Sequence, residues 1–177
     1  MENLNGVVIT DHNFGWAEDN ITKKRYDKLL QSFEEFGILV FLGIEVTCGD
    51  YDILVYPEDI ATFIDKLPGG VGRMDFHVEE VIGIAEELGA LSVLAHPHSY
   101  PKSPKKMFDA IERYNGARGV FFNPYEIVEV AGSDAHFPWG VGKAYTAFPE
   151  EIHEIGDLIR LVKSGRCSPE RKKMLYD

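Results

Sequence analysis

The sequence has little cysteine, with only Cys48 and Cys167 in 177 residues. Two thiols cannot build the disulfide framework of a small secreted domain, and their scarcity fits a reducing compartment. Cys48 follows an apolar run and is interpreted as a small packed side chain. Long apolar runs are also missing, since none approaches the ~18–20 residues of a membrane-spanning helix, and no signal-peptide pattern is present. We therefore expect a cytoplasmic protein with no membrane contact.

Positive charge is the second scarcity. The 18 Lys and Arg residues face 29 Asp and Glu residues, which gives a net charge of −11. This balance argues against a sequence-independent nucleic-acid surface, because such surfaces are basic. Three sequence patterns are absent as well: the phosphate-binding P-loop, the dinucleotide fingerprint and the Gly-x-Ser-x-Gly elbow of serine hydrolases. The length predicts one domain over residues 1–177, with a polar tail at 164–177 that frays, and it leaves a homo-oligomer open.

Apolar runs of strand length alternate along the chain with segments of helical spacing. We expect strands at residues 6–10, 38–47, 51–56, 91–95, 119–122, 127–130 and 143–148. We expect helices at residues 17–36, 57–67, 77–88 and 151–163, and a helix or a helix followed by a strand at 105–114. This alternation indicates an α/β fold with a parallel sheet or a barrel.

Chemistry-bearing residues follow four of these apolar runs. The runs are followed by Asp11 and His12, by Glu45, by His96 and His98, and by Asp134 and His136. An Asp-x-His spacing at the end of a strand presents both side chains on the same face, because alternate residues point the same way. Carboxylates and imidazoles are ligands for divalent metals. The pattern is typical of an α/β barrel enzyme whose site lies at the carboxyl ends of its strands.

Two of these residues carry specific expectations. Glu45 lies in a long apolar run, where a buried carboxylate needs either an ion pair with a basic side chain or a metal, and a carboxylate that bridges two cations suits a two-metal hydrolase. His96 precedes Pro97, which should hold the backbone of His96 extended and direct its imidazole outward. The alternative for His96 is a hydrogen-bonded core histidine.

Each of the remaining candidate residues has two interpretations. Of Asp11 and His12, one could bind a metal while the other holds that ligand in orientation, or both could belong to a polar turn. His98 could chelate with His96 or face solvent. The basic residues after this pair could hold a phosphate, or they could form a solvated loop; they are Lys102, Lys105 and Lys106.

Together the motifs resemble the PHP family, the polymerase and histidinol phosphatase domain. The matching segments are Ile-Thr-Asp-His-Asn at 9–13, Gly-Ile-Glu-Val at 43–46, Ala-His-Pro at 95–97 and Gly-Ser-Asp-Ala-His at 132–136. The resemblance covers residues 6 to about 148. It implies a distorted (β/α)7 TIM-like barrel and a site for two or three ions of zinc, manganese, iron or magnesium. It also implies hydrolysis of a phosphoester in a small phosphorylated metabolite or nucleotide, by metal-activated water.

By position in these motifs, the resemblance implies roles for single residues. The metal ligands would be His12, Glu45, His96, Asp134 and His136. The resemblance also places Asp11 behind these ligands. From the residues themselves we expect Asp11, His96 and His136 to take part in catalysis and His98, Lys102 and Lys105 to contact the substrate. No histidine precedes His12, although the family opens with a His-x-His motif, so we expect a barrel without its first strand and a site without two of its ligands.

Two functions other than a phosphoesterase remain open. One is a catalytically degenerate domain that binds metal or a partner, and the missing His-x-His motif is its support. The other is a metal-dependent hydrolase of amide bonds, because amidohydrolases also place His and Asp at the ends of barrel strands.

Overall fold

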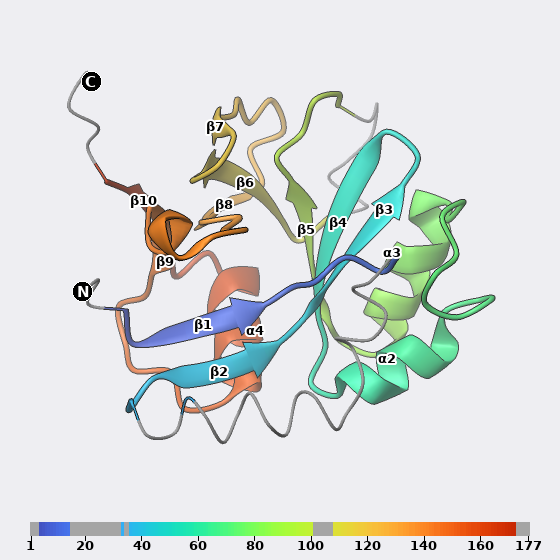
Figure 1. Ribbon diagram of the computed structural model, residues 1–177, viewed down its shortest axis with the longest axis horizontal. Coiled ribbons are helices and arrows are strands. Elements are labelled where there is room, and N and C mark those ends of the chain that lie inside the picture. The colour runs from blue at the N-terminus through green and yellow to red at the C-terminus, as the bar shows by residue number, and fades with distance from the viewer. Residues whose placement is uncertain (1–3, 15–32, 34–35, 101–107, 173–177) are drawn as a thin grey trace.

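The computed structural model describes residues 4–14, 33, 36–100 and 108–172, and its ribbon is shown in Figure 1. Its central element is a mixed six-stranded sheet. Neighbouring strands run in the order β3 (Ile44–Cys48), β4 (Tyr51–Tyr56), β5 (Leu91–Ala95), β6 (Ala110–Asn115) and β7 (Gly119–Val120), and β8 (Val128–Gly132) pairs with β6. Two small sheets join it, a parallel pair of β1 (Gly6–Ile9) with β2 (Leu39–Leu42) and an antiparallel pair of β9 (Ala144–Ala147) with β10 (Ser168–Arg171).

The predicted (β/α)7 TIM-like barrel is wrong. Among the residues that the structure describes, β3 pairs with β4 and β4 with β5 in antiparallel fashion, and the strands form three sheets without a closed barrel. The cause lies in the loop after Cys48, where Gly49 adopts φ 62° and only two residues separate the strands. Such a loop can join only antiparallel strands, because a parallel crossover needs about a dozen residues.

Most predicted elements are present, with shifted ends. The predicted strand at 38–47 is divided into β2 and β3 at Gly43, where a Cβ atom would approach the Val55 carbonyl oxygen to 2.9 Å. The predicted helices at 57–67, 77–88 and 151–163 correspond to α2 (Ile60–Lys66), α3 (Val78–Glu87) and α4 (Ile155–Lys163). The predicted helix at 17–36 lies almost entirely outside the described residues. The expected frayed tail is wrong in part, because Ser168–Arg171 forms β10.

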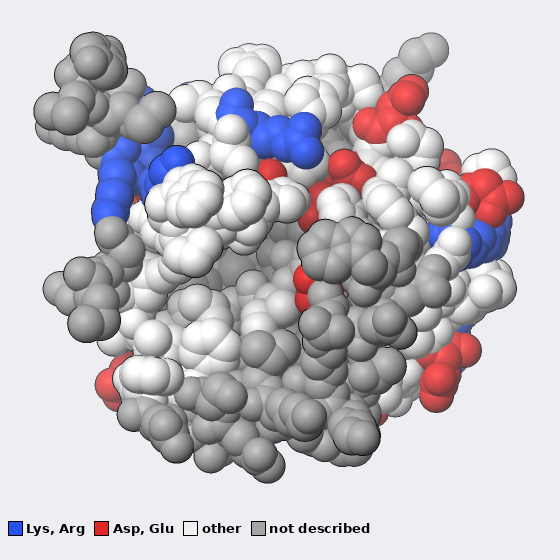
Figure 2. All heavy atoms as spheres, viewed as in Figure 1, with Lys and Arg blue, Asp and Glu red and all other residues white. Residues whose placement is uncertain are grey.

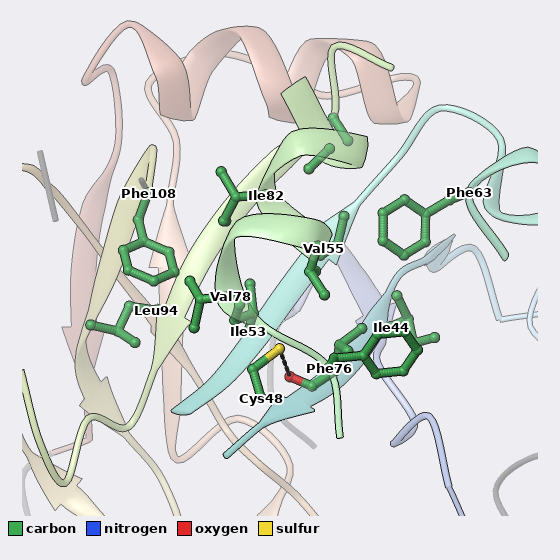
Figure 3. Close-up of a cluster of buried hydrophobic side chains, with 14 of the residues drawn as sticks. Ile44, Cys48, Ile53, Val55, Phe63, Phe76, Val78, Ile82, Leu94 and Phe108 are labelled. Atoms are coloured by element: carbon green, nitrogen blue, oxygen red, sulfur yellow. Dashed lines mark hydrogen bonds between the residues drawn. The ribbon is translucent and has the colours of Figure 1, made fainter. Parts of the chain in front are cut away.

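Alternation along the strands buries both faces of the sheet. In β4, Ile53 and Val55 contribute to a core beneath α2 and α3, whereas Leu54 joins a second core beneath α4. The first core also holds Cys48, which is 3% exposed, so the interpretation of Cys48 as a packed side chain is confirmed. Figure 3 shows these side chains between α3 and the sheet. Burial on both sides fixes the strand ends that carry the candidate site.

The molecular surface is hollowed near the middle of the face shown in Figure 2, and acidic side chains lie to one side of the hollow. None of the helices in the described residues has the length and apolar character needed to cross a membrane.

Candidate metal site

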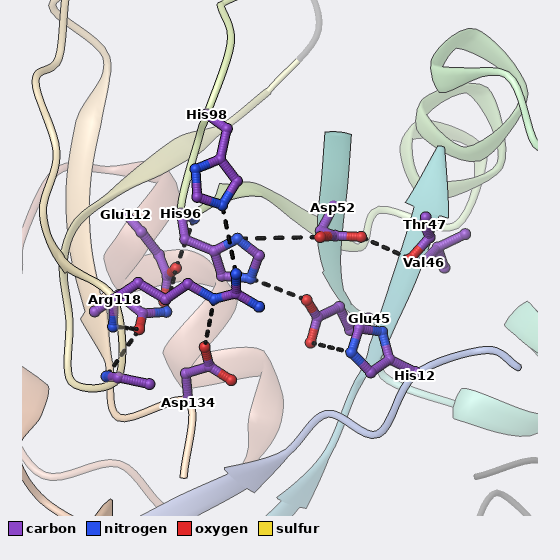
Figure 4. A network of polar contacts seen from close by, with 12 residues as sticks. His12, Glu45, Val46, Thr47, Asp52, His96, His98, Glu112, Arg118 and Asp134 are labelled. Carbon is purple, nitrogen blue, oxygen red and sulfur yellow. Dashed lines mark hydrogen bonds and ion pairs between the residues drawn. The ribbon is translucent and has the colours of Figure 1, made fainter. Parts of the chain in front are cut away.

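The candidate site is built around the carboxylate of Glu45, which lies between two imidazoles. Glu45 is on β3 and is 7% exposed. Its Oε1 lies 3.1 Å from Nε2 of His96, which follows β5, and its Oε2 lies 3.8 Å from Nε2 of His12, which follows β1. The three side chains converge although 84 residues separate His12 from His96 (Figure 4). The sequence-based expectation that these strand ends meet at one site is therefore supported by the geometry.

Backbone pairing explains why His12 reaches Glu45. The chain after β1 continues along β3, because the Glu45 N–H donates to the carbonyl of Asp11 at 3.0 Å and the Asn13 N–H donates to the carbonyl of Glu45 at 2.9 Å. His12 and Glu45 form a parallel bridge at this point. Asp11 thus takes part in the site through its carbonyl group, which holds Glu45 in register.

Asp52 completes this group, and the sequence reasoning missed it. Ligand atoms of His12, Glu45 and Asp52 all lie within 4.8 Å of one another. Asp52 Oδ2 also lies 4.0 Å from Nδ1 of His96, while Oδ1 accepts a hydrogen bond from Thr47 Oγ1 at 2.6 Å. The β3–β4 hairpin pairs Thr47 with Asp52, so Asp52 shares a face with Glu45. The two-residue turn was the signal, because it fixes this register.

We call His12, Glu45, Asp52 and His96 the inner cluster, and its donor set fits a divalent metal ion. Two imidazoles and two carboxylates are the nitrogen and oxygen ligands that zinc, manganese and iron accept. The Nδ1 atom of His12 is buried and has no hydrogen-bond partner among the described residues. A buried imidazole nitrogen without a partner is costly, so an additional ligand at this point would be stabilising.

Glu112 supports His96 from behind, and it too was missed. Its Oε2 accepts the backbone N–H of His96 at 2.8 Å and the side-chain amide of Asn115 at 3.1 Å. Glu112 is 3% exposed, and burial raises the pKa of its carboxyl to about 7, although these two hydrogen bonds oppose the shift. A Cβ atom on Gly132 would lie 2.7 Å from Glu112 Oε1, so glycine at this position leaves room for the carboxyl.

The conformation of His96 differs from the expectation. Its backbone has φ 22° rather than an extended value before Pro97, so the prediction of an extended residue is wrong. This region is uncommon for side chains other than glycine, and the hydrogen bond to Glu112 helps to hold it. Burial lowers the pKa of the His96 imidazole, but the hydrogen bond with Glu45 and the nearby charges of Glu112, Glu45 and Asp52 outweigh burial and raise that pKa above its usual value.

Asp134, His136, His98 and Arg118 form an outer cluster beside the inner one. Asp134 follows β8 with φ 47°, and its Oδ2 lies 3.5 Å from Nε of Arg118. Nη1 of Arg118 lies 3.5 Å from Nε2 of His98, whose ring centroid is 6.0 Å from that of His96. The side chain of His136 is 62% exposed, and its Nδ1 lies 3.4 Å from Asp134 Oδ1.

The structure therefore divides the predicted site residues between two groups. His12, Glu45 and His96 meet in the inner cluster, and Asp134, His136 and His98 lie in the outer one. Lys102 and Lys105 lie outside the described residues. Arg118 contributes a guanidinium to the outer cluster, and no sequence motif indicates its role. The side chain of Asn115 accepts the backbone N–H groups of Ala117 and Arg118, which connects Arg118 to Glu112 and His96.

Comparison with known proteins adds a family and a fold. Residues 112–167 match the model of the PHP-associated family. No curated protein matches the chain significantly. Three solved structures have a similar fold. Their sequence identities to this chain are low enough to show the fold alone.

The first is a two-domain protein from Bacteroides vulgatus that contains a predicted PHP-like metal-dependent phosphoesterase, with 15% identity and a TM-score of 0.70. The match covers 96% of this chain and 57% of that one, so the chain spans little more than half of that protein. The second is a protein from Bifidobacterium adolescentis named as a metal-dependent phosphoesterase, with 17% identity, a TM-score of 0.51 and coverage of 92% and 86%.

The third structure is an amidohydrolase from Chromobacterium violaceum, solved with sulfate and without metal. It shares 14% identity over 98% of this chain and 89% of that one, with a TM-score of 0.53. The family match covers β6 to α4, and the motifs at residues 9–13, 43–46 and 95–97 supply the inner cluster. The resemblance to the PHP family noted from these motifs is confirmed by the family match over residues 112–167 and by the fold shared with two structures named as PHP-like or metal-dependent phosphoesterases.

Proposed function

We propose that this protein is a metal-dependent phosphoesterase that hydrolyses the phosphoester of a small phosphorylated metabolite or nucleotide. The observation that carries the proposal is the Glu45 carboxylate between His12 and His96, with Asp52 beside them. A carboxylate in this position can bridge two cations, which is the arrangement of two-metal hydrolases. The family match and the names of two structural neighbours support the same reaction class.

The inner cluster would hold the metal in this proposal. His12, Glu45, Asp52 and His96 would be ligands, with Asp134 as a candidate for a further ion. When bound, the metal would lower the pKa of a water molecule toward neutrality and neutralise phosphoryl oxygens. Glu112 would keep His96 in place through the backbone N–H, so its role is positioning.

The outer cluster would bind and protonate the substrate. Arg118 would contact phosphoryl oxygens, because a guanidinium presents paired N–H donors to phosphate. Its side chain is 45% exposed beside the inner cluster, so an incoming phosphate can reach it. His136 has an exposed imidazole next to Asp134 and would donate a proton to the leaving alkoxide. His98 would orient Arg118 through their 3.5 Å contact.

One observation favours a second candidate function, a degenerate domain that binds metal without turnover. Asp134 is paired with Arg118, so the positive charge of the guanidinium lies where a further metal ion would bind the same carboxylate. A protein with this pair retained would bind metal in the inner cluster only.

Metal content and turnover together test the proposal. The chain is purified without chelator, its metals are measured by elemental analysis, and hydrolysis of a panel of phosphomonoesters and phosphodiesters is measured. We expect bound zinc, manganese or iron and turnover of at least one ester. Glu45→Gln should lose both, whereas Glu86→Gln, which changes an exposed glutamate on α3, should retain both.

The alternative outcomes separate the candidates. Metal bound through Glu45 without turnover of any ester would support the degenerate domain. Turnover that survives Glu45→Gln, or a chain that binds no metal, would contradict the proposed site. Hydrolysis of amide substrates in place of phosphoesters would assign the chain to amide chemistry.

A further inference from the structure

Two aromatic rings lie stacked on each other at the surface next to the outer cluster. Phe137 and Trp139 have ring centroids 4.6 Å apart and an angle of 4° between their planes. They are nevertheless 58% and 71% exposed. Large aromatic surface left in water is unfavourable, and contiguous exposed apolar surface commonly marks a binding site. The outer face of this pair is therefore available for a ligand.

The pair forms one wall of a cavity of about 230 Å³ that also contains Asp134 and His136. The cavity thus places exposed aromatic surface next to Asp134, a candidate metal ligand, and His136, the proposed proton donor. A cation, Lys143, also lines the cavity. The other lining residues are small and leave the cavity open; they are Gly116, Ala117, Ser133, Ala135 and Gly140.

The backbone that carries the aromatic pair is packed closely next to Asp134. The rings flank a short 3-10 helix, Pro138–Gly140, in which the Gly140 N–H donates to the Phe137 carbonyl at 2.9 Å. A Cβ atom on Gly140 would lie 3.2 Å from the Cβ atom of Ala135, the residue after Asp134. On the opposite side, a Cβ atom on Gly116 would lie 2.7 Å from the Ser133 carbonyl oxygen. The Gly140 contact thus holds the backbone that carries the two rings next to Ala135, and the Gly116 contact holds the backbone at Ser133, directly before Asp134.

We propose that Phe137 and Trp139 form a stacking platform for a planar aromatic ring in the alcohol part of the substrate. The inference rests on the proposed phosphoesterase function and names its substrate class, a phosphoester that carries an aromatic ring, as nucleoside monophosphates do. The phosphate lies at Arg118 and the inner cluster, and the ring lies on the exposed face of Trp139. Lys143 contributes a positive charge to the same cavity.

Ring binding is measured without any requirement for hydrolysis. The sequence contains two tryptophans, so a Trp16→Phe background leaves Trp139 as the only indole. Titration with adenosine and with adenosine monophosphate should quench its fluorescence, and the monophosphate should bind more tightly. Calorimetry should show that Trp139→Leu weakens binding of both probes by about tenfold or more, the range of one base–aromatic stack. Phe122→Leu is the matched control, because Phe122 is 68% exposed but does not line the cavity.

Turnover separates failure of the platform from failure of the proposed function. We expect Trp139→Leu to lower kcat/KM for adenosine monophosphate about tenfold and to leave glycerol phosphate, which has no ring, within twofold of the unaltered chain. If Trp139→Leu loses ring binding but the unaltered chain hydrolyses neither ester, the platform is retained and the proposed function is contradicted. Equal loss on both esters, no ring binding, or self-association that Trp139→Leu abolishes would overturn the platform.

Discussion

The inner and outer clusters are held in place by different means. Glu45 and His96 are 7% and 4% exposed, and they are attached to strands buried on both faces. The side chains of His136 and Arg118 are 62% and 45% exposed, and contacts between 3.4 and 3.5 Å with charged neighbours position them. The inner cluster is thus part of the core, whereas the outer cluster lies at the surface beside it.

This difference has a consequence for mutagenesis. A change in the inner cluster alters folding and metal binding together, because the same contacts serve both. A change in the outer cluster acts on the substrate with little effect on folding, because exposed ion pairs contribute little to stability. Variants that separate the two effects therefore test whether the clusters have the proposed roles.

The largest effect is expected from Glu45→Ala. Removal of the carboxylate leaves the buried imidazole of His96 without its 3.1 Å partner and removes the proposed bridging ligand. Breaking a buried charged pair costs about 3–5 kcal/mol, so we expect a loss near the lower end, and bound metal should be absent. Urea unfolding with excess chelator measures the folding part alone. An unchanged free energy of unfolding would show that Glu45 is not integrated in the core.

A smaller loss is expected from Gly132→Ala. The added methyl group would lie 2.7 Å from Glu112 Oε1, and Glu112 is held by His96 and Asn115. Overpacking of this kind costs about 1–3 kcal/mol. The matched control is Gly83→Ala, which has open space on an exposed face of α3 and should be stabilising, because alanine favours the helix. Equal stability of the two variants would mean that Glu112 moves freely.

The inner cluster could be predicted from the sequence to a large extent, because three of its four residues follow apolar runs of strand length. His12, Glu45 and His96 were all found in this way. Asp52 was not, because its place depends on a hairpin that reverses the chain after two residues. The same hairpin explains why the predicted barrel is wrong, because the spacing of strands and helices in the sequence does not indicate whether neighbouring strands are parallel or antiparallel.

The outer cluster was harder to predict, because it depends on tertiary placement. Asp134 and His136 stand in a motif, but their distance from Glu45 follows from where β8 ends. Arg118 lies in the loop between β6 and β7, and only the folded chain shows that its guanidinium reaches Asp134. Glu112 has the spacing of a strand residue, and its burial is visible only once β8 covers it with Gly132.

Arg118→Gln should separate binding from folding. We expect the free energy of unfolding to change by less than about 1 kcal/mol, because Arg118 is 45% exposed, and kcat/KM for a phosphoester to fall about tenfold. Arg160→Gln alters another exposed arginine that pairs with Asp157, and it should leave turnover unchanged. If Arg118→Gln instead raises metal affinity and turnover stays absent, the degenerate domain is favoured.

The smallest effect concerns the core beneath the inner cluster. The thiol of Cys48 lies among buried apolar side chains (Figure 3), and this burial raises its pKa from 9.0 to about 12, with the negative charge of Asp52 adding to the shift. The folded state therefore keeps the proton while the unfolded state loses it, so stability is complete below pH about 9 and declines from there toward about 12. Between pH 8 and 9.5 we expect this group to lower the free energy of unfolding by less than about 1 kcal/mol. Cys48→Ala should remove that slope in urea unfolding and Cys167→Ala should retain most of it, because Cys167 lies nearer the surface. A slope that persists in Cys48→Ala would assign it to another buried group and would show that the core around Cys48 admits water.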